Sequence, residues 1–104
     1  MPKFIVEWNL PKDLTKDKYM AKKVKSLDIY PKIPECKWEA TFLADDMSKC
    51  YCVYDAPDEE TVRKAREMVK SDVDLLAAVD EITPESLEKQ RDEENAGEEQ
   101  QAAG

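Results

Sequence analysis

Two cysteines separated by one residue are the first side chains in this sequence whose types and spacing suggest chemistry. Cys50 and Cys52 lie in residues 49–55, where β-branched and aromatic residues predict a strand, so both sulfurs share one face. Two thiols so placed can bind a soft metal ion or form a redox centre. A strong zinc or iron–sulfur motif needs a second ligand pair, and Cys36 is the only other cysteine. The alternative is that both thiols are small buried hydrophobic side chains.

Glu7 is a carboxylate at the centre of a predicted strand that neighbours the strand of the two cysteines. Such a group is a pocket acid, a metal ligand or one half of an ion pair. Trp38 and Tyr54 belong to a set of aromatic residues that either line a ligand pocket or pack in the core. We expect ligand binding by Glu7, Trp38, Cys52 and Tyr54, and metal binding by Cys50, Cys52 and Glu7.

The composition excludes several classes of function. The 104 residues include no histidine, which excludes Ser-His-Asp and Cys-His triads as well as HExxH and Cys2His2 zinc sites. A net charge of −8 argues against charge-driven binding of nucleic acid. Both glycines lie in the C-terminal tail, so there is no glycine-rich phosphate loop, and no apolar run reaches the length of a membrane helix. Three cysteines cannot all pair within one chain, and we expect a cytoplasmic protein.

Hydrophobic patterns predict six elements in the first 82 residues. Two helices are expected, one capped by Thr15 and one beginning near Asp58. Strands are expected at residues 3–9, 36–44, 49–55 and 72–82. The centre of the last of these segments also fits a helix.

The same patterns predict which side chains face the core. The first helix should bury its apolar positions and turn its lysines to solvent. Those apolar positions are Met20, Val24 and Leu27. In the second strand, alternation places three residues on one face. They are Trp38, Ala40 and Phe42.

The order β-α-β-β-α-β is typical of ferredoxin-like α+β folds, in which an antiparallel four-stranded sheet carries two helices on one face. The other face has no predicted element to cover it, although it must carry apolar strand residues. A second subunit is the natural cover, and we expect a homodimer of the dimeric α+β-barrel type.

The C-terminal segment differs in composition from the rest of the chain. Residues 85–104 hold seven acidic and two basic side chains, and Leu87 is the last large apolar residue. Thr83-Pro84-Glu85-Ser86 has the form of a helix start with proline at the first position. We expect a ferredoxin-like domain over residues 1–83 and an acidic tail over 84–104 that is partly helical or disordered.

The segment Tyr51–Glu60, which reads Tyr-Cys-Val-Tyr-Asp-Ala-Pro-Asp-Glu-Glu, resembles the small nickel-binding-protein-like family. The resemblance extends over residues 2–83. It implies a ferredoxin-like fold, a dimer through the open sheet face and, in some members, nickel or a similar ion bound by histidine and carboxylate. Family members that resemble this chain usually carry a histidine soon after the arginine of the second helix, in an Arg-Glu-His-Ala motif that is followed by a Gly-Phe-Pro turn. This chain instead has Arg63-Lys-Ala-Arg66 and Lys70-Ser-Asp72.

These observations predict a small dimeric binding protein that takes a divalent metal such as nickel or zinc, or a small molecule, at the open sheet face. Nickel favours imidazole or thiolate over carboxylate alone, so the missing histidine should weaken a family-type site or move it to Cys50, Cys52 and Glu7. The alternative is a small dimeric α+β-barrel enzyme, isomerase or monooxygenase-like, in which a pocket carboxylate such as Glu7 moves a proton. A third interpretation is an interaction module without chemistry.

Overall fold

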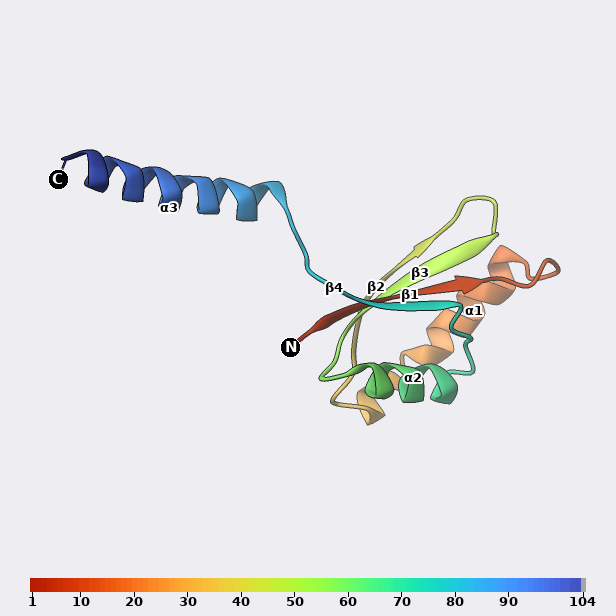
Figure 1. Ribbon diagram of the computed structural model, residues 1–104. Helices are drawn as coiled ribbons and strands as arrows, with labels where there is room; N and C mark the ends of the chain where they lie inside the picture. The colour runs from red at the N-terminus through yellow and green to blue at the C-terminus, as the bar shows by residue number, and fades with distance from the viewer. Residues whose placement is uncertain (104) are drawn as a thin grey trace.

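The protein is built on a four-stranded, antiparallel, open sheet (Figure 1). The computed structural model describes the backbone of residues 1–103 and the side chains of residues 1–96. The strands lie in the order β2-β3-β1-β4. In chain order the elements are β1 Lys3–Asn9, α1 Lys16–Ser26, the short 3-10 helix η1 Tyr30–Lys32, β2 Lys37–Leu43, β3 Lys49–Asp55, α2 Glu59–Met68, β4 Leu75–Val79 and α3 Pro84–Ala103. The α+β class and the predicted order of the four strands and the first two helices are confirmed.

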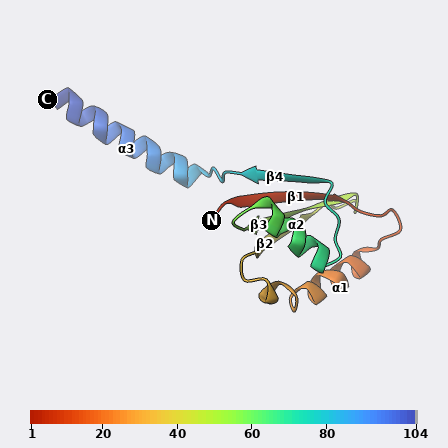
Figure 2. The same cartoon turned by 60° about the horizontal axis from the view of Figure 1, so that its bottom comes forward.

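Helices α1 and α2 pack on one face of the sheet, and the opposite face is open in the described part of the chain (Figures 1 and 2). Alternate residues of β1, namely Phe4, Val6 and Trp8, are buried beneath the helices. The antiparallel register pairs these residues, in the same order, with Tyr54, Cys52 and Cys50 of β3. The core therefore lies between the sheet and the two helices, and both predicted ligand thiols are inside it.

Helix α1 turns a different face to the sheet from the one that its apolar spacing predicts. Its start is as predicted, because the Thr15 hydroxyl accepts a hydrogen bond from the backbone N–H of Lys18 at 3.3 Å. The predicted core positions of this helix are exposed, so that expectation is wrong. They are Met20, Val24 and Leu27. The face toward the sheet carries the buried Tyr19 and Ser26 instead.

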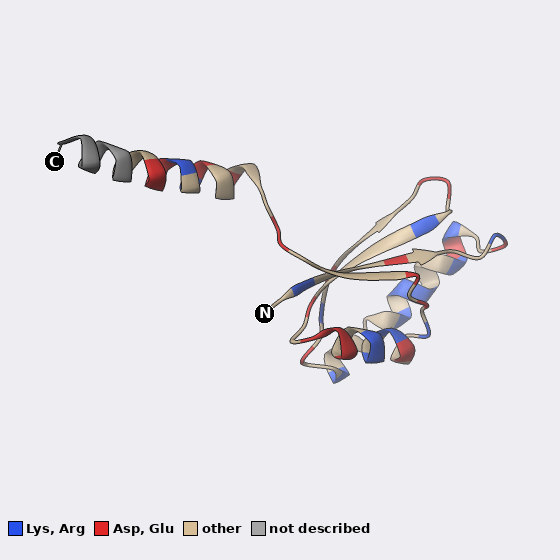
Figure 3. Ribbon diagram, viewed as in Figure 1, with Lys and Arg blue, Asp and Glu red and all other residues tan. Residues whose placement is uncertain are grey.

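Two lysines of α1 lie half-buried on this inner face because their amino groups find partners there. Lys22 Nζ donates to the backbone carbonyls of Val69 and Lys70, at 3.0 and 2.7 Å, where α2 ends. Lys23 Nζ lies 5.4 Å from the centre of the Trp38 ring. The basic residues along α1 in Figure 3 are therefore not all on a solvated face.

A β-bulge in β2 changes which of its residues share a face. The register passes from Trp38 opposite Tyr54 to Ala40 opposite Val53, so Glu39 is an extra residue. Trp38 consequently lies on the helix-covered side, whereas Phe42 lies on the open side opposite Tyr51. The prediction that Trp38, Ala40 and Phe42 share one face is wrong for this reason.

Helix α2 begins as predicted and ends in an unusual way. Asp58 is the N-cap, and its carboxylate accepts from the Thr61 N–H at 2.8 Å. At the other end, Lys70 adopts a left-handed conformation with φ 55°. The Lys70 N–H donates to Glu67 O and the Ser71 N–H donates to Arg66 O, which is the Schellman pattern that usually places glycine at this position.

Helix α3 leaves the end of β4 and projects away from the sheet and its helices (Figures 1 and 2). Its start is capped reciprocally, because the Thr83 hydroxyl accepts from the Ser86 N–H and the Ser86 hydroxyl accepts from the Thr83 N–H. Residues 84–96 are exposed throughout. Among the described helices, none has the length and apolar character that crossing a membrane requires.

Candidate functional site

One buried sulfur atom beneath the helices accepts three hydrogen bonds. Cys52 is fully buried in β3. Its Sγ lies 3.2 Å from the hydroxyl of Thr41 in β2, 3.3 Å from Nη1 of Arg66 in α2 and 3.5 Å from Nζ of Lys23 in α1. Two of the three donors are cationic, which favours the thiolate over the neutral thiol. We call Cys52 and these three donors the thiol site.

Arg66 is the most unusual member of the thiol site, because its side chain is only 1% exposed. Its guanidinium donates from Nη1 to Tyr54 Oη at 3.1 Å and from Nη2 to the Asp72 carbonyl at 2.6 Å, and it lies over the Trp8 ring. Among the described side chains, no carboxylate lies within ion-pair distance of it. A buried charge needs a counter-charge, and the group placed to provide one is the Cys52 thiolate.

The three cysteines have different acidities because their surroundings differ. The neighbouring Cys50 thiol, together with Lys23 and Arg66, lowers the pKa of Cys52 to about 4. The pKa of Cys50 is raised in turn, because its thiol is hydrogen-bonded to Cys52 and because it is buried. Burial alone raises the pKa of Cys36 to about 11. At neutral pH the expected state is one thiolate, on Cys52, and two neutral thiols.

Aromatic rings enclose the thiol site. The Tyr30 and Tyr54 hydroxyls are 2.7 Å apart, and the Tyr30 ring stacks on Trp38 with centroids 5.4 Å apart. Burial raises the pKa of Tyr30 to about 12 and moves that of Tyr54 further up, so both stay neutral. The structure therefore brings together Trp38, Cys52 and Tyr54, three of the four side chains expected to bind a ligand.

Glu7, the fourth, is not part of this group. Strand alternation places it on the open face of the sheet, opposite to the face that carries Cys52. Its Oε1 lies 3.4 Å from Lys49 Nζ, so it is one half of an ion pair. The proton-transfer role that the enzyme interpretation assigned to Glu7 loses its support, because its carboxylate is paired with Lys49 on the open face and lies apart from the other predicted ligand-binding side chains.

The donor set does not fit a divalent metal held by Cys50, Cys52 and Glu7. The sheet itself separates the carboxylate from the two sulfurs. Within the described residues no three histidine, cysteine or acidic side chains are grouped to hold a metal ion. In addition, the cationic groups of Lys23 and Arg66 contact the Cys52 sulfur and would repel a metal cation there.

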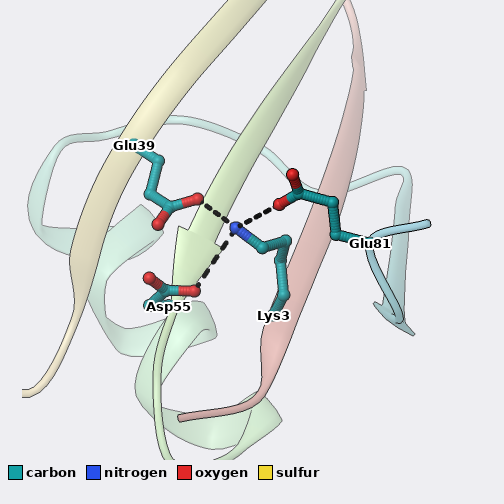
Figure 4. A network of polar contacts seen from close by, with 4 residues as sticks. All are labelled: Lys3, Glu39, Asp55 and Glu81. Carbon is teal, nitrogen blue, oxygen red and sulfur yellow. Dashed lines mark hydrogen bonds and ion pairs between the residues drawn. The ribbon is translucent and has the colours of Figure 1, made fainter. Parts of the chain in front are cut away.

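The open sheet face forms a second candidate site. Its apolar side chains are Ile5, Ala40, Phe42, Tyr51, Val53, Leu75, Ala77 and Val79. A hollow of about 500 Å³ lies over this face, between Phe42 and the end of β4. At its edge, Lys3 Nζ is surrounded by carboxylates of Glu39, Asp55 and Glu81 (Figure 4). Hydrogen bonding to Glu39 is the largest of the effects that raise the pKa of Lys3.

Sequence reasoning missed the basic half of the thiol site. Arg66 follows Val62 by four residues and precedes Val69 by three, which places it on the apolar stripe of α2. A charged residue on such a stripe is a signal for a buried ion pair. Lys23 and Thr41 gave no comparable signal, because their faces depend on the rotation of α1 and on the bulge in β2.

Comparisons with known proteins show that the chain matches a family model and resembles a solved structure. A family model described as "Nickel responsive protein SCO4226-like" matches residues 4–84. The crystal structure of SCO4226 from Streptomyces coelicolor A3(2) resembles this chain with a TM-score of 0.65, covering 78% of this chain and 99% of that one. The two sequences are 16% identical, so the likeness concerns the fold. No curated protein matches the sequence.

Proposed function

Because the chain belongs to the nickel responsive SCO4226-like family, we propose that it is a small homodimeric binding protein of ferredoxin-like fold. The strand order β2-β3-β1-β4, with α1 and α2 on one face, supports the ferredoxin-like assignment. Residues 1–83 form the folding unit in this proposal, and residues 84–104 are an acidic appendage. The unpaired state of all three cysteines supports a reducing compartment, the cytoplasm.

The open sheet face is the observation that carries the proposal. Phe42 is 63% exposed there and Leu75 is 49% exposed, beside the partly exposed Tyr51. A contiguous apolar patch of this kind marks an interaction surface. If two subunits pack their sheets face to face, the patch of each subunit is buried against that of the other. Glu7 lies between Tyr51 and Leu75 in this patch, where Lys49 offsets its charge, and the Lys3 group lies at the opposite end of the sheet, where a dimer would leave it at the rim.

We propose that the ligand is a small molecule held in the hollow over the open face, which pairing would enclose. Ile5, Phe42 and Val53 supply apolar walls, and Glu39 and Glu81 supply an acidic end. These groups suit a ligand with an apolar body and a hydrogen-bond-donating or cationic end. Nickel or zinc suits them less well, because the ammonium of Lys3 already occupies the point where the carboxylates converge.

Native mass spectrometry of the reduced protein, with and without Ni²⁺, tests both parts. At micromolar concentration we expect a species of twice the 12.0 kDa chain mass, with the same mass after Ni²⁺ is added and removed by desalting. Phe42→Asp should give a monomer, because dimerisation would then bury an unpaired carboxylate. Val24→Asp is the matched control, since Val24 is 61% exposed on α1, away from the open face, and should stay dimeric.

Two outcomes would contradict the proposal. A wild-type monomer, or a Phe42→Asp variant that remains dimeric, would show that the open face is not the interface. Stoichiometric nickel retained by the wild-type dimer would replace the small-molecule part of the proposal with a metal site.

A further inference from the structure

Two cysteines of this chain have almost the same small exposed fraction, but one lies beside cationic groups and the other does not. Cys36 is 2% exposed and Cys52 is 0% exposed. Cys52 accepts hydrogen bonds from Lys23, Thr41 and Arg66, whereas Cys36 has no charged or hydroxyl group in hydrogen-bonding contact among the described side chains. Cys36 also lines a surface hollow, so a faster reaction at Cys52 would have to come from these surroundings and not from easier access.

The geometry around Arg66 calls for a negative charge on sulfur. Among the described residues, the buried guanidinium has no carboxylate partner and its Nε atom has no hydrogen-bond partner. A second cation, Lys23 Nζ, lies 3.5 Å from the Cys52 sulfur, and the Arg66 guanidinium is held over the Trp8 ring. A thiolate is the nucleophilic form of cysteine, so the group that neutralises Arg66 is also the group prepared to react.

We propose that Cys52 is a site of covalent oxidation by hydroperoxides, with hydrogen peroxide as the smallest member of the class. The Cys52 sulfur attacks one peroxide oxygen, an S–O bond forms, and the O–O bond breaks. Hydroxide leaves and takes a proton to become water. The sulfur loses two electrons and becomes a sulfenic acid, and the peroxide is reduced by the same two electrons. No further reactant is needed.

Cys50 is the thiol nearest to this product, and a disulfide between the two would be strained in the folded chain. Two residues of a strand on the same face are separated by about twice the 3.3 Å rise, which is close to the upper limit of the Cα distance that a disulfide allows. The β3 ladder holds this spacing through its pairs with β1 and β2. An external thiol or trapping reagent therefore competes with slow formation of that disulfide for the sulfenic acid.

The wild-type protein contains its own comparison. Its reduced form is treated with hydrogen peroxide in the presence of dimedone, which traps sulfenic acids, and the label on each cysteine is followed by peptide mass spectrometry. At about pH 7 only about one part in 10⁴ of Cys36, with its pKa of about 11, is ionised. Once ionised, Cys36 is about 10³ times more nucleophilic than the less basic Cys52 thiolate, which offsets most of this difference. Labelling of Cys52 should therefore be about tenfold faster than labelling of Cys36.

The pH profile separates thiolate chemistry from access to the buried site. Between about pH 6 and about pH 8 the rate at Cys52 should stay constant, because the sulfur is already ionised, and the rate at Cys36 should rise about tenfold per pH unit. Lys23→Met removes one cation and should raise the pKa of Cys52. Because the sulfur stays ionised at about pH 7 and a more basic thiolate is the better nucleophile, labelling of Cys52 should become about threefold faster for each pKa unit gained. Lys25→Met is the control, because Lys25 is an exposed lysine of the same helix, and should leave the rate unchanged.

Each contrary result would overturn the proposal. Labelling of Cys36 as fast as Cys52, or a rate at Cys52 that rises with pH as steeply as at Cys36, would show that Cys52 is an ordinary thiol. Equal effects of Lys23→Met and Lys25→Met would show that the Lys23 contact is irrelevant. The wild-type comparison does not depend on whether any variant folds.

Discussion

Lowering the pH from about 7 to about 5.5 should destabilise this protein, although it contains no histidine. Carboxylates titrate mainly below this range, and histidine is the side chain that normally titrates within it. The group that should respond is Cys52, whose pKa is lowered to about 4 in the folded protein by Cys50, Lys23 and Arg66. In the unfolded chain the same thiol has a pKa near its usual value of about 8.5.

The sign and size of the effect follow from proton linkage. Between the two pKa values the unfolded chain carries a proton on Cys52 and the folded chain does not, so unfolding takes up one proton. The free energy of unfolding should rise with pH in this window by about 1.4 kcal/mol per pH unit. From about pH 5.5 to about pH 7 the gain is about 2 kcal/mol. This stabilisation is fully present above the pKa of Cys52 in the unfolded chain, and it is lost as the pH falls through the pKa of Cys52 in the folded protein.

Urea unfolding at constant protein concentration, at several pH values in this window, measures the slope. Cys52→Ser should abolish the slope, because serine does not ionise, and Cys36→Ser should retain it. A flat wild-type profile, or equal slopes in wild type and Cys52→Ser, would refute the assignment of the thiolate. The ultraviolet absorbance of the thiolate, titrated in the folded wild-type protein, gives the same answer without a variant.

Two further predictions concern groups next to the thiol site and at the end of α2. Tyr54→Phe removes the hydroxyl that accepts from Arg66 at 3.1 Å, and we expect a loss of about 1–3 kcal/mol in the free energy of unfolding, with Tyr51→Phe as a nearly neutral control. Lys70→Gly relieves a left-handed backbone at φ 55° and should raise the urea midpoint by the equivalent of about 1 kcal/mol; a lower midpoint would contradict this reasoning.

Local patterns were enough to predict the elements but not how they face one another. The alternation in β1 and the capping residues Thr15 and Asp58 act within a few residues, and the structure has these elements where they were predicted. The orientation of α1 depends on long-range partners, since Lys22 reaches the carbonyls that end α2. Apolar spacing alone therefore predicted that the side of α1 with Met20 faces the core, whereas that side is exposed.

The thiol site shows the same division between what is local and what is not. The shared face of Cys50, Cys52 and Tyr54 follows from strand alternation and is seen in the structure. The cations that contact Cys52 come from two helices that are separated in sequence, and their arrival depends on the packing of both. Glu7 was grouped with the cysteines because it lies on the neighbouring strand, but strand neighbours need not share a face of the sheet.

The extra residue in β2 has a consequence for how copies of this protein meet. Strands β2 and β4 are the two edges of the sheet, and an unprotected edge can add a strand from another chain. Glu39 interrupts the β2 ladder near its middle and places a charge there, while β4 offers only five residues. Growth of the sheet from chain to chain, the route to fibrils, is therefore disfavoured at the β2 edge, and contact through the face of the sheet is left open.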